Sequence, residues 1–304
     1  MVKKGSSPSF RDVMCASQRA VFIKRFARDP HDPIGVFFKH FENIHATTMA
    51  FHGSLRATGR LLSFDTAAEA YLKKSLPSKE LADVKRVARE QAQEGYPVVF
   101  GYASILIWSA TETFFRDAVK AWLSGPSDCW RGTGAISEKF DINDYEKWRE
   151  DGSLGEKLFD VVERKSRESA RDSPLARWQW ILKQLRLTPR LGKEHGEVLR
   201  ELVLVRNLLA HSPGGIVDDQ FWSKWSNRWR KRWPGLKSGD RLSIGYIDVL
   251  GYLTAAASYC NAIDRRIGKR IGEMSANEKL PSAPSLGPLH VALQLAQKNK
   301  SSPR

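Results

Sequence analysis

The chain has 304 residues, of which 41% are hydrophobic, so it can bury an ample apolar core without disulfide or metal staples. Its three cysteines, Cys15, Cys129 and Cys260, lie far apart and form no C-x-x-C pair, which argues against a disulfide framework or a zinc ribbon and fits a reducing cytoplasm. Forty-nine Lys and Arg residues against 34 Asp and Glu residues give a formal net charge of +15, which favours a polyanionic partner such as nucleic acid.

Neither a membrane span nor a secretory signal is expected. The longest strongly apolar stretch, residues 98–108, is too short to cross a bilayer. The basic start of the chain, residues 1–8, is followed by no apolar run, unlike a secretory signal. We therefore expect a soluble protein of the cytoplasm.

The spacing of the apolar residues predicts an all-α fold, because several segments repeat at i, i+3, i+4 and i+7 and none alternates convincingly at period two. In chain order, the predicted helices are residues 33–62, 65–76, 78–95, 98–123, 143–150, 155–171, 174–187, 194–211 and 243–274. Ser78 is suited to an N-cap and Pro97 to the first turn of the helix that follows it. The chain is thus expected to consist of helices joined by loops.

These helices are expected to form one bundle with additions. Residues 96–275 are interpreted as the helical bundle domain, in which residues 126–190 are an insertion with helices of its own. Residues 1–95 form an N-terminal helical extension, and residues 276–304 are expected to be a flexible tail.

The predicted helix that ends at His211 carries the residues best suited to chemistry. Most of this helix is apolar, but Arg200, Asn207 and His211 fall within roughly 40° of one another on a helical wheel and form a polar seam. Arg206 projects to the side of the seam. Its guanidinium is expected either to be paired inside the protein or to meet an anion at a cleft wall.

These side chains suit the cleavage of RNA without a metal or a cofactor. The 2′-hydroxyl of RNA can attack the neighbouring phosphorus, so a protein needs to supply only proton transfer and stabilisation of the charged phosphorane. We assign His211 to proton transfer, Arg206 to the phosphorane oxygens, and Asn207 to positioning a phosphate or orienting His211. No metal site is expected, since the histidines near the N-terminus lack acidic partners at a metal-ligand spacing.

The Arg-x4-His spacing alone is not specific, because Arg190 and His195 repeat it in the same chain. The copy formed by Arg206 and His211 differs from that one in three ways: Asn207 follows the Arg, the surrounding helix is apolar, and the Ser-Pro-Gly-Gly run at residues 212–215 ends the helix. In this setting the run LVRNLLAH, residues 204–211, resembles the signature of the HEPN superfamily, helical domains whose motif is an Arg, a following polar residue and a later His.

The resemblance would cover roughly residues 97–274. It implies a helical bundle, a homodimer that brings two motifs together, and metal-independent endoribonuclease activity of the kind found in toxins and phage-defence effectors. The implied partners are RNA and an antitoxin or defence-system protein. Because some members are noncatalytic, a helical module that binds RNA or a partner protein is the alternative function.

The resemblance also suggests an acidic residue on the first core helix that supports the motif. Glu112 is the candidate, because it shares an apolar helical stripe and a carboxylate there is costly unless it meets a cation such as Arg206. The alternative is an i,i+4 pair between Glu112 and Arg116 on the same helix.

A basic, tryptophan-rich segment follows the motif. Its four tryptophans recur at helical spacing, which is typical of core packing, although aromatic stacking with nearby cations also suits single-stranded RNA. We favour core packing for the tryptophans, with a basic outer face that steers RNA toward the motif. The candidate RNA-binding residues on that face are Lys224, Arg228, Arg230, Lys231 and Arg232.

Overall fold

The computed structural model describes residues 33–64, 77–94, 97–125, 136, 142–170, 173–212, 215–223, 230 and 232–278. Within these ranges all regular elements are helices, which confirms the predicted all-α class. The predicted helix at residues 65–76 and most of the predicted tail lie outside the described residues.

The helices agree closely with those predicted from the apolar spacing. They are α3 (Pro33–Phe64), α5 (Ser78–Glu94), α6 (Pro97–Leu123), α7 (Ile142–Glu150), α8 (Leu154–Ser169), α9 (Pro174–Gln184), α10 (Lys193–His211), α11 (Asp219–Ser223) and α13 (Tyr246–Glu278). The helix α10 ends at the predicted residue, His211, where a C-cap in an extended conformation at Ser212 stops it.

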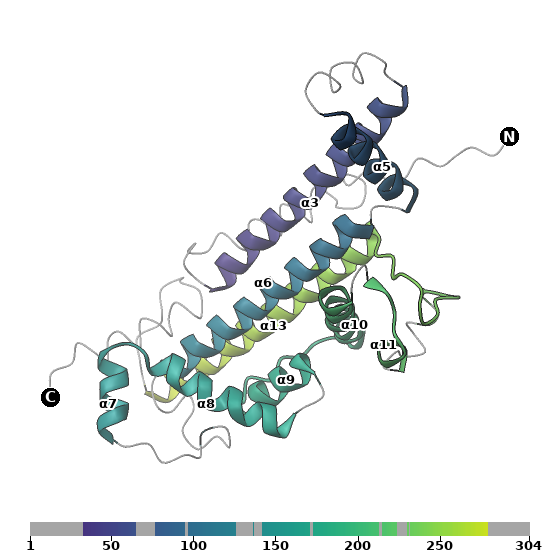
Figure 1. The fold of residues 1–304 in the computed structure, drawn as a ribbon. Coiled ribbons are helices and arrows are strands. Elements are labelled where there is room, and N and C mark those ends of the chain that lie inside the picture. The colour runs from purple at the N-terminus through teal and green to yellow at the C-terminus, as the bar shows by residue number, and fades with distance from the viewer. Residues whose placement is uncertain are drawn as a thin grey trace.

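Two long helices, α6 and α13, lie side by side at the centre of the fold (Figure 1). They run in the same direction, since the ring of Phe100 near the start of α6 lies 6.1 Å from that of Tyr246 at the start of α13. The helix α3 packs along α6, α10 contacts both central helices near their beginning, and α8 packs on α6 near its end. The motif helix is thus held at one end of the central pair.

The core is continuous across the domain boundaries expected from the sequence. Trp178 of α9, from the predicted insertion, stacks on Trp108 of α6 with ring centroids 4.5 Å apart and on Phe115 at 4.6 Å. Phe37 of α3, from the predicted extension, lies 5.6 Å from Phe114 of α6. Aromatic pairs of this kind each add about 0.5–1.5 kcal/mol beyond the area they bury. Extension and insertion therefore both help to stabilise α6.

The helix α6 bears on the expectation that the chain has no membrane span. It is long and apolar enough, by length and composition alone, to cross a membrane, although the shorter stretch considered in the sequence is not. In the fold, 56% of its most apolar window is buried by other parts of the chain. Burial of this kind is typical of the core helix of a soluble protein.

Candidate functional site

The apolar residues of α10 fix the helix on α6 and α13 and leave its polar residues toward the outside. Its buried residues are Leu199, Glu201, Leu202, Val203, Val205 and Leu208. Arg206 and Asn207 are partly buried, and His211 is exposed at the C-terminal end. The predicted motif therefore lies at the surface, on a helix whose other side is locked in the core.

A tight turn holds the chain that follows the motif. Gly215 adopts a φ of +71°, which favours glycine, and a Cβ at this position would lie 2.9 Å from Cδ2 of Leu209, so the Leu209 side chain would have to shift. The carbonyl of Gly215 accepts a hydrogen bond of 2.9 Å from the amide of Leu242, and Ile216 forms an antiparallel bridge with Arg241. The end of α10 is thereby fixed to the segment that leads into α13.

An open pocket of about 150 Å³ lies beside this turn. It is lined by Pro97, Val98, Gly101, Tyr102, Ile105, Leu209, Gly215, Arg241 and Leu242. None of the predicted motif residues is among them. The pocket therefore adjoins the motif helix at Leu209 but contains none of the residues assigned to the chemistry.

Arg206 is partly buried and lacks an acidic partner. Its Nη1 donates a hydrogen bond of 3.1 Å to Oδ1 of Asn207, and its Nε is buried without a hydrogen-bond partner among the described residues. No carboxylate in the described part of the chain forms an ion pair with it. No described carboxylate pairs with the charge of this guanidinium, so it is suited to an external anion.

Asn207 and His211 are not joined as the sequence suggested. The Asn207 amide oxygen accepts from Arg206, so within the described residues this side chain orients Arg206 and not the imidazole. The His211 side chain is exposed and makes no hydrogen bond or ion pair with any described residue. The helical wheel places Asn207 and His211 on one face, but it does not fix which neighbour the amide chooses.

The structure does not bring Glu112 into contact with Arg206. Its partly buried carboxylate pairs with neither Arg206 nor Arg116, and no hydrogen bond or ion pair joins it to another described residue. The reason is the position of Glu112 along α6. Gly101 of α6 lies against Leu209 of α10, and Glu112 lies eleven residues further along α6. That separation is about 16 Å along the helix axis. The helical wheel gives the face of α6 on which Glu112 lies, but not its position along the helix axis relative to Arg206.

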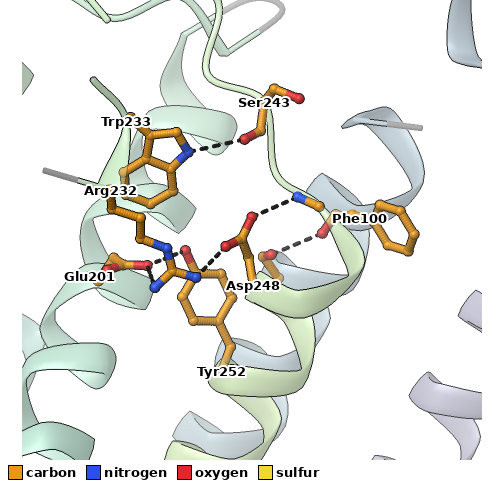
Figure 2. Close-up of polar contacts among 9 residues, drawn as sticks. Phe100, Glu201, Arg232, Trp233, Ser243, Asp248 and Tyr252 are labelled. Atoms are coloured by element: carbon orange, nitrogen blue, oxygen red, sulfur yellow. Dashed lines mark hydrogen bonds and ion pairs between the residues drawn. The ribbon is translucent and has the colours of Figure 1, made fainter. Parts of the chain in front are cut away.

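The acidic residue that pairs with a cation at α10 is instead Glu201, which is on α10 itself. Its side chain is 3% exposed, and its Oε1 accepts a hydrogen bond of 2.8 Å from the hydroxyl of Tyr252 (Figure 2). Nη1 of Arg232 lies 2.9 Å from the same oxygen, and Nη2 of Arg232 pairs with Oδ1 of Asp248. We call Glu201, Arg232, Asp248 and Tyr252 the buried ion cluster.

The buried ion cluster fastens the segment before α13 to α10. Oδ2 of Asp248 accepts a hydrogen bond of 2.7 Å from the amide of Gly245, as the third residue of a helix does when it caps the first turn. Burial, together with the nearby carboxylate of Glu201, raises the pKa of Tyr252 well above its usual value, so its phenol stays a neutral donor. The cluster thus has a structural role next to the motif.

This arrangement corrects the predicted RNA-binding set at Arg232. Its guanidinium lies between two carboxylates and cannot serve the basic outer face expected from the sequence. Arg230 is exposed, as that face requires, whereas Lys224, Arg228 and Lys231 lie outside the described residues. The sequence offered one signal for the pairing of Arg232. Glu201 lies on an otherwise apolar stretch of α10, and a buried carboxylate needs a cation from elsewhere in the chain.

Trp233 packs against the edge of the core, as favoured for the tryptophan-rich segment. Its ring is partly buried, and its Nε1 donates a hydrogen bond of 3.3 Å to the carbonyl of Ser243 (Figure 2). The side chains of the other three tryptophans of this segment lie outside the description of the structure. Trp233 therefore belongs with the structural contacts of Arg232.

No family model, curated protein or solved structure matches this chain. A function for the chain is therefore inferred from the motif residues and from the contacts that they make.

Proposed function

We propose that the protein is a metal-independent endoribonuclease that acts through Arg206 and His211. The observation that supports this most directly is the state of Arg206, which is partly buried on an apolar helix and has no carboxylate partner within the described residues. A phosphate would supply the negative charge that no described carboxylate provides. The net charge of +15 adds a general attraction for polyanions.

In the proposed reaction the 2′-oxygen forms a bond to the adjacent phosphorus while the bond from that phosphorus to the 5′-oxygen breaks. Arg206 binds the non-bridging oxygens as negative charge grows on them, and Asn207 holds the guanidinium through its amide oxygen. His211 transfers a proton, either from the 2′-hydroxyl or to the leaving 5′-oxygen. The products are a 2′,3′-cyclic phosphate and a 5′-hydroxyl.

One chain supplies a single motif histidine, whereas the reaction uses both a base and an acid. We therefore propose a homodimer in which a second copy brings its own His211 to the same phosphate. The surface that would pair is an apolar stripe on α6 beside the end of α10, formed by Val98, Tyr102 and Leu106, which are 38%, 64% and 47% exposed. Residues four apart share one face of a helix, so the stripe is continuous.

The stripe can be tested with Leu106→Asp, which places a charge in the proposed interface without touching the motif. We expect this variant to sediment as a monomer and to lose cleavage, because two copies of the motif no longer meet. A dimer that persists in Leu106→Asp would show that the stripe is not the dimer interface. A monomer that still cleaves RNA would show that cleavage does not require the dimer.

The activity is tested by incubating the purified protein with mixed RNAs in EDTA. We expect cleavage by the wild type and a loss of at least about 100-fold in His211→Ala. The matched control is His195→Ala, which removes the histidine of the other Arg-x4-His copy and should cleave normally. End-group analysis should find 2′,3′-cyclic phosphates.

Three outcomes would contradict the nuclease. Cleavage that needs added metal, or that survives in His211→Ala, would exclude the proposed mechanism. RNA binding by the wild type without any cleavage would favour the alternative, a noncatalytic module that binds RNA through the same surface.

A further inference from the structure

The helix α9 ends in a turn that normally contains glycine but here contains arginine. The amide of Leu187 donates to the carbonyl of Leu182 at 2.7 Å, and the amide of Arg186 donates to that of Lys183 at 3.1 Å. This pair of bonds defines a Schellman motif, and the apolar contact that accompanies it is supplied by Leu182 and Leu187, both fully buried. Arg186 occupies the left-handed position of the motif.

That position is unfavourable for arginine. Arg186 has a φ of +59° and is the sole non-glycine residue of the described chain with a positive φ. A side chain in this conformation costs roughly 1–2 kcal/mol, which glycine would avoid. The Arg186 side chain is exposed and makes no hydrogen bond or ion pair with another described residue. Since the strain is not offset by a contact of the guanidinium within the described fold, it points to a role for that group outside it.

Other cations surround this turn. Nε of Arg266 on α13 donates a hydrogen bond of 3.3 Å to the carbonyl of Arg186, which brings α13 and the end of α9 together. Lys183 precedes Arg186 by three residues and Arg190 follows it by four, and Arg265 adjoins Arg266 on α13. Lys183, Arg190 and Arg265 are exposed.

These five residues lie in two stretches of the chain that contain no acidic residue. Residues 174–193 and 265–272 contain neither Asp nor Glu. The nearest acidic residue before Arg265 in the chain, Asp264, is 1% exposed and lies in the core. Among the described residues, none of the five cations forms an ion pair. The turn and α13 therefore present a surface of uncompensated positive charge.

We propose that Lys183, Arg186, Arg190, Arg265 and Arg266 form a binding surface for the phosphate backbone of single-stranded RNA. Cations spread over two segments match a row of phosphates better than a single small anion, and backbone binding needs no base contacts. The motif helix starts at Lys193, seven residues after Arg186, and Arg206 lies about 20 Å further along it. A strand held on this surface can extend to the motif. Binding here does not depend on cleavage.

The first test uses Arg186→Gly in the full-length protein. The probe is a fluorescent 20-nucleotide 2′-O-methyl oligouridylate, which lacks the 2′-hydroxyl nucleophile, with binding followed by anisotropy in EDTA. We expect the thermal unfolding midpoint to rise, because the strain is relieved. The Kd should increase roughly fivefold at 0.1 M salt, the effect of losing one phosphate contact with a salt exponent of about 0.7. A Kd equal to that of the wild type would overturn the proposal.

The second test compares two double variants of the same net charge. Lys183→Ala with Arg190→Ala removes two cations of the proposed surface, whereas Lys147→Ala with Lys157→Ala removes two exposed lysines of α7 and α8. We expect the slope of log K against log salt to fall by about 1.4 in the first and to stay unchanged in the second. Equal slopes in both would show that only overall charge matters and would overturn the proposal. Normal cleavage of a ribonucleotide substrate alongside such a result would leave the nuclease intact.

Discussion

Arg206 on α10 and Arg232 beside α10 are both partly buried arginines, but their surroundings differ. Arg232 lies between the carboxylates of Glu201 and Asp248, and its side chain is 30% exposed. Arg206 has an amide oxygen for a neighbour and a buried Nε with no partner among the described residues. Buried charges are paired when their role is structural, so the difference separates an arginine that stabilises the fold from one that can receive a ligand.

The largest expected effect is the loss of Arg232. In Arg232→Met the carboxylate of Glu201, 3% exposed, loses its cation, and we expect a decrease of about 3 kcal/mol in the free energy of unfolding. Urea unfolding measures this as a lower midpoint. The double variant Glu201→Leu with Arg232→Met should recover most of the stability, because the carboxylate that is 3% exposed is removed together with its cation. Asp248, which is 18% exposed, keeps its hydrogen bond from the amide of Gly245. A single variant as stable as the wild type would contradict the structural role of Arg232.

A smaller effect is expected at Tyr252. Tyr252→Phe removes the 2.8 Å hydrogen bond to Glu201 but leaves the ion pair with Arg232, so we expect a loss of about 1 kcal/mol at pH 7.

The loss in Tyr252→Phe should shrink above pH 10. Because the folded protein raises the pKa of Tyr252, both states are protonated below about pH 10, and above it only the unfolded state ionises. Ionisation then destabilises the wild type by about 1 kcal/mol between pH 10 and 11, but not the variant. A difference between the two that stays constant with pH would contradict the burial of the neutral phenol.

The different surroundings of Arg206 and Arg232 also show which features could be predicted from the sequence and which could not. Helix periodicity and caps located α10 and its end at His211, because both are local properties of the chain. The partners of the charged residues were not predictable in the same way. Glu201 pairs with Arg232, which lies 31 residues later in the sequence. Glu112 was predicted to contact Arg206 from a helical wheel, but a wheel carries no information about where along their lengths two helices cross. The strain at Arg186 is likewise invisible without backbone angles.

The most direct measurement is made on Arg206→Met, with unfolding and RNA cleavage followed on the same preparation. We expect its free energy of unfolding to lie within about 1 kcal/mol of the wild type, because no described carboxylate loses a partner. Cleavage in EDTA should decrease by about 100-fold or more, because the phosphorane loses its cation. A variant that unfolds as readily as Arg232→Met while still cleaving RNA would contradict the account.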